Sequence, residues 1–208
     1  MKPSDDIEAT LELTSLVKAG RITTEQSVNL RSRIDAMSGI AGDFIAVVES
    51  AAKSPKYTPG GIADFAEMNR ATALNALDAI EKDTVAVLDQ RIADDVKLLS
   101  SAIPGTSDYE IESETRGVLM RMDPLERRLA YLKAARDGWD PVLERAVENA
   151  PQLLEIVSLG VIAQGRDERI KRTNPAQFAK LENVREHRRV TASYLSRSRS
   201  RINAYRSV

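Results

Sequence analysis

The segment LRSRIDAMSGIAGDFIAVVESA, Leu30–Ala51, carries the clearest structural pattern in this chain of 208 residues. Its apolar positions recur at alternating spacings of four and three residues: Leu30, Ile34, Met37, Ala41, Phe44, Val48 and Ala51. This heptad spacing predicts a long α-helix with one continuous apolar seam. The seam must be buried by other helices, of the same chain or of a second copy. We expect a contact between subunits of a homo-oligomer at these positions: Leu30, Ile34, Met37, Phe44 and Val48.

Two shorter signals predict a helical hairpin at the N-terminus. Ser4, followed by two aspartates, is an expected N-cap for a first helix that ends at Gly20. Thr23 and Gln26 form a capping box, in which each side chain accepts a hydrogen bond from the other residue's backbone N–H. Because the turn between the two helices is very short, we expect them to pack antiparallel.

A longer helix is expected from Ile62 to about Ile103, after a linker rich in proline and glycine. No residue in this range breaks a helix, and its apolar residues recur at helical spacing: Leu74, Leu77, Ile80, Val85, Leu88, Ile92, Val96 and Leu99. A helix of about 40 residues is about 60 Å long. It therefore needs packing partners along its length, in this chain or in another copy.

Capping signals predict several shorter helices after this one. Pro104 ends the long helix, and Ser107–Glu110 has the residue types of a second capping box. Asp123 and Asp140 each precede a proline, which favours an aspartate N-cap with proline at the first helical position. These signals divide this part of the chain into helices much shorter than the preceding ones.

The remaining pattern completes an all-α fold. The next helix is expected to begin near Pro151, and it is apolar on almost every side over Leu153–Ile162, so we expect it to be enclosed. The chain shows no alternating strand pattern, and only 4% of its residues are aromatic. The expected division is a long-helix hairpin or bundle (1–103), a cluster of short helices (104–172) and a basic C-terminal helix (173–208).

Composition excludes several kinds of chemistry. The chain has no cysteine, so it forms no disulfide and no thiolate metal site. Its single histidine, His187, has no second histidine with which to complete a helical di-iron site. The sequence also lacks a phosphate-binding glycine loop and a nucleophile elbow. We therefore expect no enzymatic activity, no cofactor and no metal.

Charge is distributed unevenly along the chain. Residues 1–163 carry 18 Lys+Arg and 27 Asp+Glu, whereas residues 164–208 carry 12 and 4. No acidic residue follows Glu186. The C-terminal helix combines arginines with a thin apolar stripe, a pattern typical of a partner-binding segment. Its expected partner-binding residues are Arg185, Arg188, Arg189, Leu195, Arg197, Arg199, Arg201, Ile202 and Tyr205.

Three interpretations of this basic helix are open. It packs against acidic faces of its own chain or of a sister subunit, it binds another protein, or it contacts nucleic-acid phosphates. The absence of a helix-turn-helix signature and of a second basic patch makes the third the least favoured. Because the apolar stripe is thin, we expect residues 187–208 to dock a partner and not to be needed for folding of the body.

Together these features favour a non-enzymatic assembly or adaptor protein that forms a homo-oligomer through its long helices and docks a protein partner through residues 150–208. This general character is similar to helical scaffold and connector proteins of tailed-phage particles, an analogy of fold alone. The alternative is a nucleic-acid-binding regulator that uses the arginine-rich helix. The longest apolar run is too short to cross a bilayer, so we expect no membrane partner and a cytoplasmic protein, or one of a virion assembled in a cytoplasm.

Overall fold

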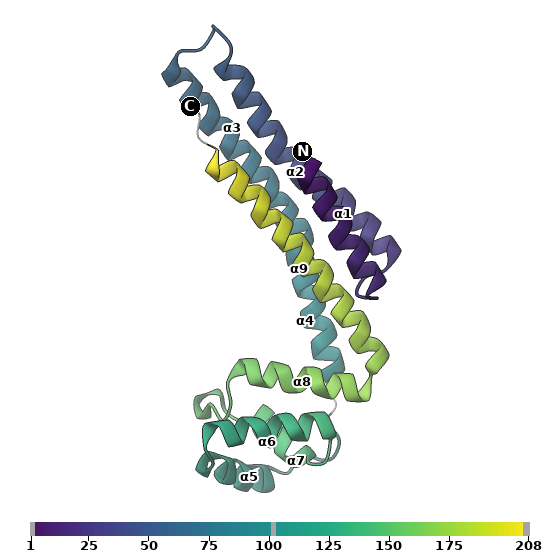
Figure 1. The fold of residues 1–208 in the computed structure, drawn as a ribbon. Helices are drawn as coiled ribbons and strands as arrows, with labels where there is room; N and C mark the ends of the chain where they lie inside the picture. The colour runs from purple at the N-terminus through teal and green to yellow at the C-terminus, as the bar shows by residue number, and fades with distance from the viewer. Residues whose placement is uncertain (1–2, 101–102, 206–208) are drawn as a thin grey trace. The chain divides into compact units, whose positions relative to one another are not determined.

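The computed structural model describes the backbone of residues 3–100 and 103–205, and 84% of it is helical (Figure 1). The described residues contain no β-strand, so the predicted all-α class is confirmed. The elements are α1 (Pro3–Lys18), α2 (Thr24–Ala52), α3 (Pro59–Ile80), the π-helical η1 (Glu81–Val85), α4 (Ala86–Ser100), α5 (Tyr109–Arg121), α6 (Pro124–Asp137), α7 (Pro141–Glu148), the 3₁₀ turn η2 (Gln152–Leu154), α8 (Leu159–Thr173) and α9 (Pro175–Ala204).

The chain divides into two compact units. Residues 1–91 and 182–208 form unit 1, and residues 92–181 form unit 2. This grouping differs from the expected three-part division, because most of α9 packs with the N-terminal helices and α4 is divided between the units. Unit 1 is therefore assembled from the two ends of the chain.

Unit 1 is built around the predicted apolar seam of α2. Every seam position is buried, and Leu30, Met37 and Val48 are fully enclosed. The seam shares one core with Leu13 of α1, Leu77 of α3 and residues of α9, whose ribbons lie beside α2 in Figure 1. The seam is confirmed as a buried helix face, but the helices that pack against it belong to the same chain. The positions expected at a contact between subunits thus lie in the interior of one chain: Leu30, Ile34, Met37, Phe44 and Val48.

The N-terminal hairpin closes through the predicted capping box. The Thr23 N–H donates to Gln26 Oε1 at 2.8 Å, and the Gln26 N–H donates to Thr23 Oγ1 at 3.1 Å. Gly20 adopts the left-handed conformation, with φ +68°, just after the end of α1. As a result, α1 lies alongside the first half of α2 (Figure 1). The side chain of Ser4, the expected cap of α1, lies outside the described residues.

The long helix runs from α3 through η1 into α4, and its one irregularity in the described residues is the π-helical turn at Glu81–Val85. The backbone stays helical on both sides, with φ −60° at Ile80 and −63° at Ala86. A π-helical turn accommodates one extra residue, which keeps Val85 on the same buried face as Leu77. The five-residue gap between Ile80 and Val85 in the apolar repeat is the mark of this turn in the sequence.

Unit 2 is a bundle of short helices around a smaller core. Among the described residues, the buried members of this core are Leu119, Tyr131, Ala134, Leu143, Val147 and Ile156. Helices α6 and α8 lie side by side and run in the same direction. The Tyr131 hydroxyl of α6 donates to the Ile162 carbonyl near the start of α8, and Arg172 near the end of α8 donates to the carbonyls of Ala134 and Ala135 near the end of α6. The two helices touch closely at Gly165, where an added Cβ would lie 2.4 Å from the Tyr131 ring.

Aspartate caps start the helices of unit 2. Asp123 and Asp140 cap α6 and α7 with proline at the first position, as predicted. Helix α5 is capped by Asp108 and not by Ser107, because Asp108 Oδ1 accepts from the first free N–H groups of the helix. The Ser107 hydroxyl instead donates to Glu112 at 2.9 Å. The N-cap therefore lies one residue later than predicted, and the predicted capping box does not form, because the N3 residue is Ile111.

The segment after α7 departs most from the sequence prediction. An enclosed helix was expected from Pro151, but the chain forms only the short η2 turn there, and α8 begins at Leu159. Glu155 takes φ +36°, a left-handed conformation that interrupts the helix. Leu153 and Leu159 are 97% and 76% exposed. Apolar composition on every side predicted burial, but a helix break turned these leucines towards solvent.

Candidate functional site

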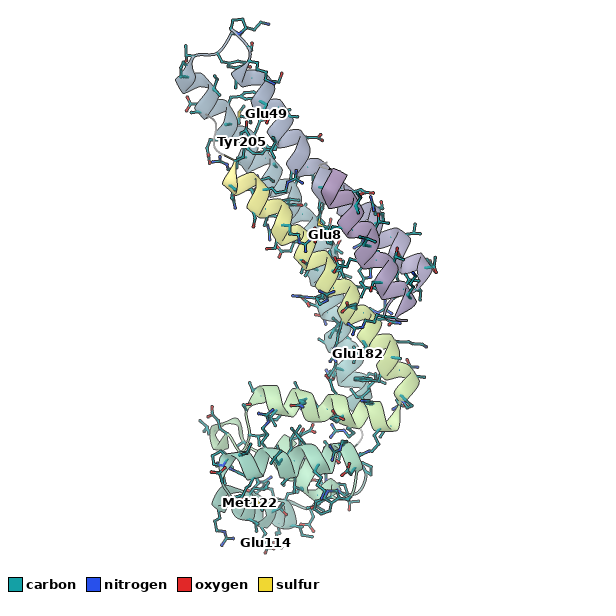
Figure 2. The ribbon with its side chains drawn as sticks, in the orientation of Figure 1. Glu8, Glu49, Glu114, Met122, Glu182 and Tyr205 are labelled. Atoms are coloured by element: carbon teal, nitrogen blue, oxygen red, sulfur yellow. The ribbon has the colours of Figure 1, made fainter. Side chains whose placement is uncertain are left out.

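The apolar half of the expected partner-binding site belongs to the core of unit 1. Leu195 and Ile202 of α9 are almost completely buried in the same cluster as the α2 seam. Tyr205 is half-buried, and its ring meets the Phe44 ring edge-on with the centroids 5.6 Å apart. Figure 2 shows Tyr205 at the end of α9, near the upper part of α2 where Glu49 is labelled. These side chains anchor α9 to its own chain.

One row of α9 arginines binds carboxylates of α1. Arg197 Nη1 lies 2.7 Å from Glu8 Oε1, and Arg189 Nη2 lies 3.3 Å from Glu12 Oε1. The Tyr194 hydroxyl also donates to Glu12, at 3.1 Å. Two acidic residues one helical turn apart on α1 therefore bind one side of α9.

A second row binds carboxylates of the long helix. Arg188 Nε lies 2.8 Å from Asp89 Oδ1, and Arg199 contacts both Asp78 and Glu81, the latter at 2.6 Å. Because Glu81 is the first residue of η1, the π-helical turn carries part of this contact. Arg185 pairs within α9, with Glu182 at 2.9 Å, and Arg201 is half-buried.

These contacts correspond to the first of the three interpretations, a basic helix packed on acidic faces of its own chain. The sequence of unit 1 contains 17 Lys+Arg and 16 Asp+Glu, so the strong asymmetry along the chain almost cancels within the unit. The individual pairs are largely exposed, and each contributes little to stability. Their arrangement on both sides of α9 nevertheless fixes its register against α1 and α3.

His187 is half-buried on α9, and its Nε2 is buried without a hydrogen-bond partner among the described residues. Burial lowers the pKa of this imidazole, and the charges of Arg33 and Arg91 lower it further. The neutral ring is therefore the favoured form in folded unit 1. Protonation of His187 would add a positive charge beside those of Arg33 and Arg91, in surroundings where burial already disfavours a charged imidazole.

Unit 1 is expected to lose stability as the pH falls below 6.5, the ordinary pKa of histidine. The folded-state pKa of His187 is depressed, so the unfolded chain takes up the proton first and the free energy of unfolding falls until the folded-state pKa is passed. Urea unfolding followed by circular dichroism at about pH 7.5 and about pH 5.5 measures the loss. Glu186, whose pKa Arg189 holds below 4.5, titrates below this window. A pH dependence that persists unchanged in His187→Gln would contradict the assignment.

Unit 2 contains a buried ionic network that the sequence did not reveal. Arg169 is 1% exposed, and its Nη1 lies 2.7 Å from Glu144 Oε2 and 2.6 Å from Glu148 Oε1. Glu148 also accepts from the Tyr131 hydroxyl at 3.0 Å and from Arg166 Nε at 2.9 Å. Burial raises the pKa of Glu148, but the hydrogen bonds from Arg169 and Arg166 outweigh it and leave the pKa below its ordinary value.

A second network lies at the other side of α7. Glu112 is buried and receives hydrogen bonds from Ser107, Asn149 and Arg145, with Arg145 Nε at 3.2 Å from its Oε1. Burial raises the pKa of Glu112, and these bonds together with the charge of Arg145 lower it below its ordinary value. Arg116 contributes a further positive charge at 3.9 Å. Helix α7 thus carries buried charged residues towards both α5 and α8.

One end of unit 2 exposes a group of large apolar side chains, which we name the apolar end face: Met120, Leu125, Leu129, Leu153, Leu154 and Leu159. They belong to the end of α5, the first half of α6, the η2 turn and the start of α8. The end of α5, the start of α6, η2 and the start of α8 lie at one end of unit 2 in Figure 1. Arg127 Nη1 of α6 lies 3.2 Å from Met120 Sδ, which joins the first two of these segments. Sequence reasoning missed this surface because it assigned Leu153–Ile162 to the interior.

The side chains that the structure describes include no group of three or more His, Cys, Asp or Glu placed to hold a metal ion. None of the helices described is long and apolar enough to span a membrane. Comparison with known protein families, with curated proteins and with solved structures gives no match to this chain.

Proposed function

We propose that this chain is a non-enzymatic helical assembly or adaptor protein that self-associates and docks a protein partner through the apolar end face of unit 2. The observation that carries the proposal is the exposure of this face, with Leu153, Leu159 and Leu125 at 97%, 76% and 60%. Large apolar side chains gathered in the exposed part of a folded unit cost solvation free energy and are typical of interaction sites. The cytoplasm, or a virion assembled there, is the proposed setting.

The backbone beside this face supports the same proposal. Glu155 is the only described residue other than glycine with a positive φ, at +36°. Such a conformation costs roughly 1–3 kcal/mol and is retained mainly where function requires it. Here it separates the η2 turn from α8, and Leu154 and Leu159 on either side of it lie outside the core. The proposed docking surface therefore lies within residues 120–159, whereas the sequence alone had favoured 150–208.

Nucleic-acid binding through α9 has less support. Arg188, Arg189, Arg197 and Arg199 already bind carboxylates of unit 1, so contact with phosphates would require these bonds to break. Fluorescence anisotropy with a short DNA duplex distinguishes the alternatives. A steep fall of affinity with salt would favour the nucleic-acid function, because each neutralised phosphate releases counterions.

Self-association is expected to depend on the apolar end face. Sedimentation should give a mass that is a multiple of 22.9 kDa. The double variant Leu125→Ser with Leu159→Ser should shift the chain towards monomer, because it removes two exposed apolar contacts without touching the core. The matched control, Val28→Ser with Met68→Ser, changes apolar residues of similar exposure in unit 1 and should leave association unchanged.

Two outcomes contradict this proposal in different ways. A strict monomer at micromolar concentration would contradict self-association. Equal effects of the two double variants would show that the contact between copies does not involve the apolar end face. Partner docking is tested separately with a photo-crosslinking residue at position 153 or at position 28, in cells of the source organism. An adduct with another protein at position 153 alone supports docking, whereas adducts at neither position contradict it.

A further inference from the structure

We infer that unit 2 holds a binding site for a small organic oxyanion, a carboxylate or a phosphate, in a cavity beside α7. The cavity has a volume of about 610 Å³. Its cationic and apolar lining residues are Lys97, Arg145, Arg166, Ala93, Val96 and Ile103. The site is separate from the apolar end face, so it adds a ligand to the proposed function and does not depend on it.

Arg145 provides a buried donor. Its side chain is 9% exposed, its Nε bonds to Glu112, and its Nη1 donates to the Pro104 carbonyl. None of the described residues accepts a hydrogen bond from its Nη2, and the Arg145 side chain lines both this cavity and a second one beside Gly105. A guanidinium held in place by two bonds is preorganised to donate its remaining N–H groups to an oxyanion.

Arg166 provides a second set of donors on the same cavity. Its Nε lies 2.9 Å from Glu148 Oε2, and its Nη1 and Nη2 bond to none of the residues that the structure describes. Glu148 already accepts hydrogen bonds from Tyr131, Arg169 and Arg166 on its two oxygens. Glu148 itself lines the cavity, and its single negative charge is shared between Arg166 and Arg169, so it offsets the charge of Arg166 only in part.

Lys97 of α4 is the third cation. It is exposed, and it makes no ion pair or hydrogen bond with any residue in the described chain. A lysine ammonium lacks the planar fork of arginine, so it contributes charge more than orientation. The apolar wall of Ala93, Val96 and Ile103 provides contact for a short hydrocarbon portion of the ligand.

The charge balance of the two networks gives the independent reason for an anion. They contain five arginines, Arg116, Arg145, Arg166, Arg169 and Arg172, and three glutamates, Glu112, Glu144 and Glu148. Positive charge that is removed from water without a counter-charge is costly. Two of the arginines line the cavity: Arg145, whose side chain is 9% exposed, and Arg166, which is 39% exposed and therefore partly solvated. A bound oxyanion would add a counter-charge chiefly for Arg145.

Calorimetric titration of the full chain tests the site, with inorganic phosphate in one arm and butyrate in the other. Ionic strength is held constant with sodium chloride. Saturable binding is expected in at least one arm, and the arms show whether a phosphate or a carboxylate with an apolar tail is preferred. Arg166→Gln should weaken that binding about tenfold or more, since a charge-assisted hydrogen bond is lost. Lys97→Gln should weaken it less.

The control variant is Lys171→Gln, which removes an exposed positive charge of α8 outside the cavity. It should bind as the unchanged chain does. Circular dichroism shows whether Arg166→Gln keeps its helix content, so that a loss of affinity is separated from a loss of fold. Heat signals that do not saturate in either arm, or that are equal in Arg166→Gln and Lys171→Gln, would overturn the assignment.

Discussion

Deletion of residues 187–208 is expected to abolish the cooperative unfolding of unit 1. The deleted segment contributes Val190, Leu195 and Ile202 to the core that encloses the α2 seam. Removal of several buried aliphatic side chains exposes their partners to water, and each such loss costs about 2–5 kcal/mol. For these three residues the total is about 6–15 kcal/mol, comparable with the whole stability of an ordinary domain, about 5–15 kcal/mol. Thermal melting followed by far-ultraviolet circular dichroism should therefore show the loss of the unit 1 transition.

A point variant separates packing from chain length. Val190→Ser, Leu195→Ser and Ile202→Ser together should have the effect of the deletion. The matched control changes three exposed positions of the same helix, Ser196→Ala, Ser200→Ala and Asn203→Ala, and should melt at or above the temperature of the unchanged chain because alanine favours helix. If the truncated chain melted like the full chain, α9 would not be needed for the folding of unit 1, and the docking role expected from the sequence would be favoured.

Replacement of Arg169 by methionine is expected to destabilise unit 2 by about 3–5 kcal/mol, the usual effect of removing one partner from a buried ion pair. Glu144 and Glu148 would remain buried with fewer counter-charges. The only tryptophan, Trp139, lies in unit 2, so its fluorescence in a urea titration reports this unit. Unit 1 should unfold at an unchanged urea concentration, as measured by circular dichroism.

The control for this variant is Arg136→Met, which removes an exposed arginine that pairs with its neighbour Asp137 at 2.9 Å. Its urea midpoint should change little, because solvent screens such a pair. The double variant Glu144→Gln with Arg169→Met should recover part of the lost stability, since it removes one unpaired buried charge. Equal midpoints for Arg169→Met and Arg136→Met would show that the buried network does not stabilise unit 2.

Local signals in the sequence predicted most of the helices. The seam from Leu30 to Ala51, the capping box at Thr23 and the aspartate caps at Asp123 and Asp140 all have their predicted structures. Each of these features depends on residues within one or two helical turns of each other. Their physical cause is contained in a short window of sequence, so the pattern alone is sufficient.

Features that depend on distant residues were not predictable in the same way. Arg197 and Glu8 are separated by 189 residues, and charge alone did not indicate which acidic face α9 would meet. The exposure of Leu153 also escaped prediction, because composition does not show where a positive φ at Glu155 will interrupt a helix. The candidate cavity around Arg145 depends on three helices meeting, and no spacing along the sequence encodes it.

The construction of unit 1 from both ends of the chain determines the order in which a nascent chain can fold. Residues 92–181 are synthesised before most of α9, so unit 2 can complete its structure before unit 1 does. At a synthesis rate of about 5–20 residues per second, α1, α2 and α3 wait roughly 5–20 seconds for their last partner. During that interval the side of the α2 seam that α9 will cover is open to water, where chaperones bind apolar segments. Unit 1 therefore completes its folding only after α9 has been made.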